Sequence, residues 1–293
     1  LEIPSTAFRE FSSSPLMTST LLVWEENWWK DNIRFIDYFK LRGSVSQTGN
    51  DALVDGDGNY DHSIQYLTTY AFNNAGTVFG GQENKRLYPS RTPNPNITWE
   101  VGTTYNVGLD FKFLQNRLSW ETDVFYHKRT NMLISRNASL PEITGITLPR
   151  ENLGEMKNRG FESLVSWQDK IGEVEYGASL NMTYARNEIT FWDEVQNVPE
   201  YQFSTGRPVG SRNMLLYVTQ AEIDEARAKG LLYSDNTVPG DIRFKDMNGD
   251  GKIDGLDRIR PEKNQEPRFV AGLTLTAKWK GFDLMMLWQG ATG

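Results

Sequence analysis

The sequence reads Tyr105-Asn-Val-Gly-Leu-Asp-Phe-Lys-Phe113, then Leu114-Gln-Asn-Arg117, then Leu118-Ser-Trp-Glu-Thr-Asp-Val-Phe-Tyr126. Apolar or aromatic side chains occupy nearly every second position of the first and third stretches, and mostly polar residues stand between them. A period of two is that of a β-strand with one apolar face. The short segment between the two stretches fits a tight turn, so we expect an antiparallel hairpin.

The same alternation recurs along the chain and predicts further strands. Short turns are expected at Asp169-Lys-Ile-Gly172 and at Lys280-Gly281. Long polar loops are expected at residues 48–98, 129–157 and 187–267. The additional strands are predicted at residues 37–47, 158–167, 173–186, 269–279 and 282–289.

The lengths of these connections decide the predicted class. Short and long connections alternate, so the tight turns lie at one end of the strands and the long loops lie at the other. Strands of about 10 residues with one apolar face, connected in this way, are typical of an outer-membrane β-barrel. Aromatic residues near the predicted strand ends would form the interfacial girdles: Tyr38, Trp99, Tyr126, Trp167, Trp279 and Trp288. A soluble sandwich or propeller is the alternative, although such folds rarely carry long loops regularly at one end.

Composition narrows the possible functions. A net charge of -7 argues against a nucleic-acid partner. The chain has no cysteine, which excludes disulfides and thiolate metal sites, and its two histidines are far apart in sequence. No segment reaches the ~18 apolar residues of a spanning helix, and no signal peptide is visible at the start. We expect either a cytosolic protein or, because the chain stops just after an apolar run, a fragment of a longer precursor.

One stretch of the last long loop has the spacing of a calcium loop. The expected ligands are the side chains of Asp246, Asn248, Asp250, Asp254 and Asp257 and the carbonyl oxygen of Lys252. Calcium takes six to eight oxygen ligands, and Gly251 would allow the sharp turn between them. Asp257 stands at the twelfth position of the loop, where glutamate is usual, and its side chain is shorter. The alternative is a polar turn without an ion.

The same loop holds other candidate features. A helix is predicted from Thr219 as N-cap, through Glu222 of a capping box, to Gly230 as its stop. Three aromatic residues could stack on sugars, although packing within the loop or in a girdle fits each of them as well: Trp192, Tyr201 and Phe203.

Glu121 and Asp123, which share a strand face with His127, raise the alternative of an enzyme with paired carboxylates that acts on glycans. These residues are more simply interpreted as polar members of a barrel wall. We therefore do not expect an enzyme.

Several stretches resemble the C-terminal barrel of SusC/RagA-like TonB-dependent outer-membrane transporters. The resemblance covers residues 25–293, whereas residues 1–24 match poorly and form an N-terminal segment or junction. It is carried by Lys40-Leu-Arg-Gly-Ser-Val-Ser-Gln-Thr-Gly-Asn50, Pro93-Asn-Pro-Asn-Ile-Thr-Trp-Glu100, Tyr126-His-Lys-Arg-Thr130, Asn158-Arg-Gly-Phe-Glu162 and Gly240-Asp-Ile-Arg-Phe-Lys-Asp-Met-Asn-Gly-Asp-Gly-Lys-Ile-Asp254.

The resemblance implies an all-β fold, an antiparallel transmembrane β-barrel of about 22 strands filled by a plug, of which this chain is about a third. It implies the outer membrane of Bacteroidetes-type cells, a SusD-like surface lipoprotein as partner, and import of glycans, or of peptides in the RagA branch. A TonB complex would supply energy through N-terminal parts, which are not seen here. Without plug and final strands, this piece should neither close nor transport. The alternative from another class is a soluble, calcium-stabilised β-domain that binds glycans or protein.

Overall fold

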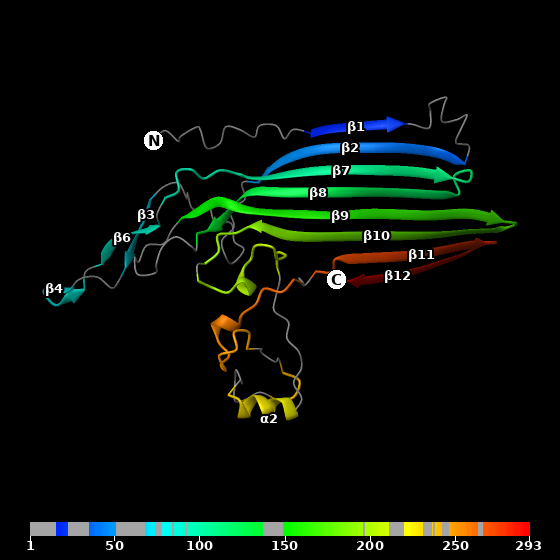
Figure 1. Cartoon of the computed structure of the whole chain (residues 1–293). Coiled ribbons are helices and arrows are strands. Elements are labelled where there is room, and N and C mark those ends of the chain that lie inside the picture. The colour runs from blue at the N-terminus through cyan, green and yellow to red at the C-terminus, as the bar shows by residue number, and fades with distance from the viewer. Residues whose placement is uncertain are drawn as a thin grey trace.

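The computed structural model describes residues 16–22, 35–50, 68–73, 78–83, 85–91, 93–136, 149–195, 197–210, 220–230, 236, 238–241, 246–262 and 266–293. Eight long strands form one antiparallel sheet in the order β1-β2-β7-β8-β9-β10-β11-β12 (Figure 1). Their bounds are β1 Leu16–Leu22, β2 Ile36–Asn50, β7 Glu100–Phe113, β8 Leu118–Ser135, β9 Arg150–Ile171, β10 Val174–Phe191, β11 Phe269–Trp279 and β12 Phe282–Thr292.

Smaller elements lie toward the long-loop end of this sheet: β3, β4 and β6 extend past the strands, and α2 lies below them in this view (Figure 1). Two small sheets pair β3 with β6 and β4 with β5. No helix in the described part of the chain is long and apolar enough to cross a membrane. The bounds are β3 Thr69–Asn73, β4 Val78–Phe79, β5 Gln82–Glu83, β6 Arg86–Arg91, η3 Glu200–Gln202, α2 Gln220–Ala228 and η4 Gly255–Asp257.

The predicted antiparallel, all-β architecture is confirmed. The opening hairpin is β7 and β8, in which Tyr105 lies opposite Tyr126. Its turn places Leu114, Gln115 and Asn116 at positive φ. The other two predicted tight turns connect β9 to β10 and β11 to β12. All three hairpins turn at the same end of the sheet (Figure 1).

The strand register joins the alternating apolar residues into one continuous face, called here the apolar face. Leu41 lies opposite Leu109, and Leu273 lies between Leu180 and Trp288. Aromatic rings stack along this face, with Phe111 and Trp120 at 5.5 Å between centroids. Side chains at its centre stay exposed, including Val107 at 54% and Val124 at 58%. A soluble sandwich would bury such positions, so this face is built to meet an apolar surrounding.

Several strands continue past the points where alternation ends. β8 runs to Ser135, β9 starts at Arg150 and β10 runs to Phe191, inside segments expected to be loops. The β8–β9 ladder shifts register between Arg129 and Met132, near Asn131 at positive φ, and then continues. Backbone pairing needs no apolar face in water, so side-chain period could not reveal these extensions. Within residues 1–24, β1 pairs with β2 from Leu16↔Ser46 to Leu22↔Lys40.

Candidate functional site: a polar wall and an acidic loop

The face opposite the apolar one, called here the polar wall, is held together by Arg42 of β2. Its Nη2 donates to Asp110 Oδ1 of β7 and to Asp123 Oδ2 of β8, both at 2.8 Å. The guanidinium reaches β8 by crossing β7 at Gly108, which lies opposite both Arg42 and Asp123. A Cβ at Gly108 would lie 2.5 Å from Asp123 Oδ1 and 2.7 Å from Arg42 Cζ. Three strands are thus joined because the middle one has no side chain there.

Large side chains lie over other glycines of the polar wall in the same way. A Cβ at Gly160 would lie 2.7 Å from Cζ of Phe125, and one at Gly102 would lie 3.0 Å from Cε1 of His127. His127 also shares a hydrogen bond of 2.8 Å with Thr104 Oγ1. Asp123 binds Arg42, and His127 binds Thr104. Two of the residues considered for an enzyme acting on glycans are therefore engaged in contacts within the polar wall.

The acidic loop, residues 246–257, folds around the carboxylate of Asp246. Its two oxygens accept hydrogen bonds from the N–H groups of Gly249 at 2.6 Å and Gly251 at 2.9 Å. Both glycines have positive φ, 76° and 80°, which other residues rarely adopt. Asp257 closes the loop by accepting from Met247 N at 2.8 Å and Asp254 N at 2.7 Å. These bonds, first that from Asp254, hold the pKa of Asp257 below its usual range.

The other predicted ligands also bind backbone groups of the loop. Asn248 Oδ1 accepts from Asp250 N at 3.0 Å, and Asp250 Oδ1 accepts from Lys252 N at 2.9 Å. Asp254 Oδ1 accepts from Leu256 N at 2.7 Å and caps η4. Across the described ranges, no group of three or more His, Cys, Asp or Glu residues is arranged to hold a metal. The calcium site therefore stays a prediction.

The segment 192–210 clamps the acidic loop and carries the three predicted aromatic candidates. Tyr201 donates its hydroxyl to the Leu256 carbonyl at 2.7 Å, and Gln202 donates to the Gly255 carbonyl at 3.0 Å. Partial burial and the nearby aspartates, Asp257 foremost, raise the pKa of Tyr201. Trp192 and Phe203 are half-buried in the same segment. The structure thus places Tyr201 against the acidic loop.

Other supports of this region carry no signal in the sequence. Glu194 Oε1 accepts from Ser204 N at 2.8 Å and Thr205 N at 2.7 Å, which fixes the return of the segment. Glu194 and Gln202 follow no period or motif, so only the folded loop reveals them.

The helix expected to stop at Gly230 is α2, and Gly230 has a φ of 72°. Thr219 and the side chain of Glu222 lie outside the described residues.

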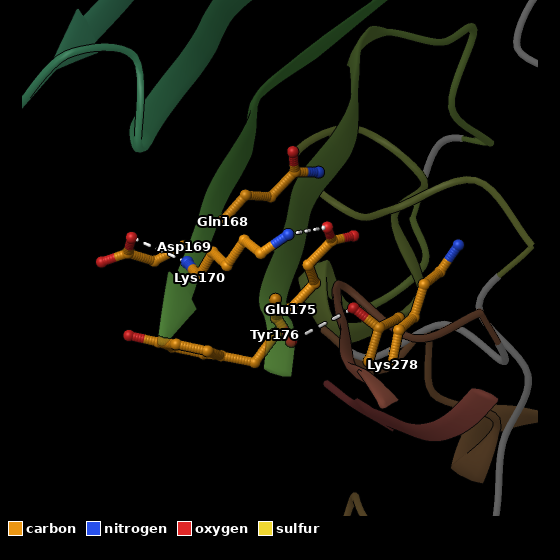
Figure 2. A pocket seen from close by; sticks show the side chains of 8 residues that line it. Gln168, Asp169, Lys170, Glu175, Tyr176 and Lys278 are labelled. Carbon is orange, nitrogen blue, oxygen red and sulfur yellow. Dashed lines mark hydrogen bonds and ion pairs between the residues drawn. The ribbon is translucent and has the colours of Figure 1, made fainter. Parts of the chain in front are cut away.

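A hollow of about 520 Å³ lies at the short-turn end of the polar wall (Figure 2). Lys170 Nζ and Glu175 Oε1 form an ion pair of 3.0 Å across β9 and β10, and Lys278 of β11 stands beside them. Thr276 Oγ1 donates to the Gly177 carbonyl at 3.5 Å. The hollow is lined mostly by polar residues and is open, which suits contact with another surface better than enclosure of a small molecule.

Comparison with known proteins identifies the family. The family model described as TonB dependent receptor-like, beta-barrel, matches residues 16–276. The chain belongs to this TonB-dependent receptor family. Its members are outer-membrane proteins, so the resemblance, the barrel fold and the outer-membrane location expected from the sequence are confirmed. The soluble sandwich and propeller alternatives are excluded. In such a barrel the apolar face meets lipid and the polar wall lines the lumen.

Curated relatives cover nearly the whole chain. TonB-dependent receptor SusC of Bacteroides thetaiotaomicron is 28% identical over 267 residues, which are 88% of this chain and 25% of SusC. TonB-dependent receptor P26 of Formosa agariphila is 24% identical over 306 residues, which are 99% of this chain and 29% of P26. The chain thus spans less than a third of these receptors.

Solved structures show the same fold. The RagAB peptide importer in its open-open state matches with a TM-score of 0.65 and 20% identity, over 94% of this chain and 28% of that chain. Its closed-closed state matches with a TM-score of 0.61 and 22% identity. These relatives are receptors and importers rather than enzymes.

Proposed function

We propose that the protein containing this chain imports oligosaccharides across the outer membrane, driven by a TonB complex. The observation that carries the proposal is a row of uncharged hydrogen-bonding residues across the polar wall near its long-loop end. Strand register places them side by side: Ser46, Thr104, His127, Asn158 and Asn187. All five residues are half-buried, so part of each side chain is open on the wall. Hydroxyl-rich cargo can exchange hydrogen bonds with such uncharged donors and acceptors.

A peptide cargo is the second candidate, favoured by the structural likeness to the RagAB peptide importer. A peptide importer gains from charged side chains that bind the termini and side chains of its cargo. In this wall the charges of Arg42, Asp110 and Asp123 are engaged with one another. The row near the long-loop end is made of uncharged side chains, and this composition supports glycans.

The partner of this proposal is a SusD-like surface lipoprotein that covers the long-loop end. The small sheets, the segment 192–210, the acidic loop and α2 all lie at this end (Figure 1). They offer polar backbone and side chains beyond the apolar face. Contact with TonB would come through parts of the protein outside this chain.

The acidic loop is proposed to bind calcium in a structural role. Its donors are all oxygens, as a hard cation requires, and Asp246 already draws the loop around one point. Calcium would supply the positive charge that four clustered aspartates need. Asp250→Ala should lower calcium affinity and loosen the loop, read by isothermal titration and hydrogen exchange, while the barrel stays folded. Calcium titration of the full-length receptor that leaves exchange in residues 246–257 unchanged would overturn this role.

The cargo is tested with the full-length receptor and its lipoprotein in a deletion host. Uptake of labelled oligosaccharides and labelled peptides is compared between the wild type and Asn158→Ala. Oligosaccharide uptake that falls in the variant supports the proposal, with the lipid-facing Thr122→Ala as matched control. Uptake of peptides alone would overturn it in favour of the peptide candidate.

A further inference from the structure

Two arginines lie directly opposite each other on the apolar face. Arg159 of β9 pairs in register with Arg186 of β10. Arg159 is exposed and Arg186 is half-buried. Cβ atoms of directly opposed residues are about 4.5–5.5 Å apart, and like charges in this position destabilise a sheet. The pair therefore needs an anion between or above the two guanidinium groups.

The pair stands at the edge of the apolar face that lies toward the long loops. One step toward the turns, Phe161 and Tyr184 stack with ring centroids 6.0 Å apart. Arg159 also lies opposite Tyr126, whose ring centroid is 6.3 Å from that of Tyr105. Aromatic rings at the end of an apolar strand face mark the boundary between hydrocarbon and headgroups. Because long loops are extracellular, the arginines lie at the headgroup level of the outer leaflet.

The next row toward the loops shows how this sheet neutralises like charges when it uses its own residues. Lys128 lies opposite Lys157. Lys128 Nζ is 3.0 Å from Glu155 Oε2, and Lys157 Nζ is 2.8 Å from Glu188 Oε1. Among the described residues, neither Arg159 nor Arg186 has a carboxylate partner. The lysine row is thus balanced internally, and the arginine row keeps two positive charges at the lipid boundary.

We propose that Arg159 and Arg186 bind the phosphate group of an outer-leaflet lipid. Two planar guanidinium groups can each donate a pair of hydrogen bonds to phosphate oxygens. The headgroup boundary is less polar than water, which strengthens this contact. A lipid is the occupant because its acyl chains would cover Phe161 and Tyr184 while its phosphate reaches the arginines. Inorganic phosphate would leave those rings uncovered.

The test uses the full-length receptor in nanodiscs of phosphatidylcholine with a minor fraction of the phosphorylated lipid A. Bound lipid is measured by native mass spectrometry after mild detergent release. The R159Q/R186Q variant should retain at least about tenfold less lipid A than the wild type, because several charge-assisted hydrogen bonds are lost. R159K/R186K should retain an intermediate amount of lipid A. Lysine keeps the positive charge but lacks the planar guanidinium that donates two hydrogen bonds to one phosphate.

The matched control removes two charges at the opposite boundary. R117Q/K280Q changes residues that are 3.1 Å from Asp169 and 2.9 Å from Glu173 at the short turns. This control should retain lipid A as the wild type does, and inorganic phosphate should not displace the lipid. Where the double variant does not fold, R159Q and R186Q are tested singly.

Two results would overturn the proposal. The first is equal retention of lipid A by R159Q/R186Q and the wild type. The second is displacement of the lipid by inorganic phosphate, which indicates a site for the free anion.

Discussion

Gly108 controls how the polar wall is joined, because its missing side chain is the passage for Arg42. Asp123 on β8 would otherwise be separated from Arg42 on β2 by a full strand. The guanidinium donates to two carboxylates at 2.8 Å, and all three residues remain partly exposed. A partly exposed ion pair of this kind contributes modestly to stability, so its main effect is to fix side-chain positions in the lumen.

Gly108→Ala should therefore break the contact between Arg42 and Asp123 and destabilise the barrel by about 1 kcal/mol. Urea unfolding of the full-length receptor in detergent measures the change. Asp123→Asn in the Gly108→Ala background should add little, because both substitutions remove one interaction. Fully additive effects would show that Gly108 and Asp123 act separately. Gly43→Ala is the control, since a Cβ there meets nothing within 4 Å.

Asp257 makes the acidic loop sensitive to acid. Its pKa is lowered in the folded chain by the N–H groups of Asp254 and Met247. A carboxylate with a lowered pKa stabilises the fold above its ordinary value, near 4, and this contribution is lost as the pH falls through the lowered value. The protection factors of the Met247 and Asp254 N–H groups, taken against the intrinsic exchange rate at each pH, should thus be high at neutral pH and fall on strong acidification. In Asp257→Ala these protection factors should be low throughout, whereas a pH profile like that of the wild type would contradict this role.

At the scale of elements, the strands of the sheet were predictable because apolar side chains recur at every second position. Leu109 and Val124 alternate with polar residues because lipid lies on one side and water on the other. The period stops where water lies on both sides, so the ends of β8, β9 and β10 were not foreseen. The clamp of Gln202 on Gly255 could not be foreseen either, since it joins two irregular segments far apart in sequence. The acidic loop was recognisable only because its residues are consecutive.

Leu180 tests the assignment of the two faces. It belongs to the apolar face of β10 and lies opposite Val165 and Leu273. Leu180→Arg should cost about 2–4 kcal/mol, because a charge would enter the hydrocarbon region. Thr183→Arg is the matched control on the polar wall of the same strand, opposite Glu162, and should cost much less. Equal costs in folding titrations into lipid vesicles would contradict the assignment.

At the scale of the whole molecule, β12 shows that the described sheet needs more protein. Every residue of β12 is exposed, including Leu284 at 54% and Leu287 at 64%. The strand pairs with β11 on one side only within the described chain. An exposed apolar strand with an unpaired edge is a template for aggregation.

The chain expressed alone should accordingly be insoluble in water and require detergent. Its apolar face and its edge strands would both associate with other copies. Ultracentrifugation with and without detergent measures this. A soluble monomer that melts cooperatively in water would contradict the prediction.

The long connection between β10 and β11 has a consequence for how these receptors diversify. The chain leaves β10 at Phe191 and returns at Phe269, yet the two strands pair without a shift from Glu175↔Lys278 to Tyr184↔Phe269. The entropy of closing a loop grows with the logarithm of its length, about 0.6 kcal/mol for each doubling. Insertions and deletions between these strands therefore disturb the wall little. The segment can therefore be exchanged while Leu180 and Leu273 keep the two strands in register.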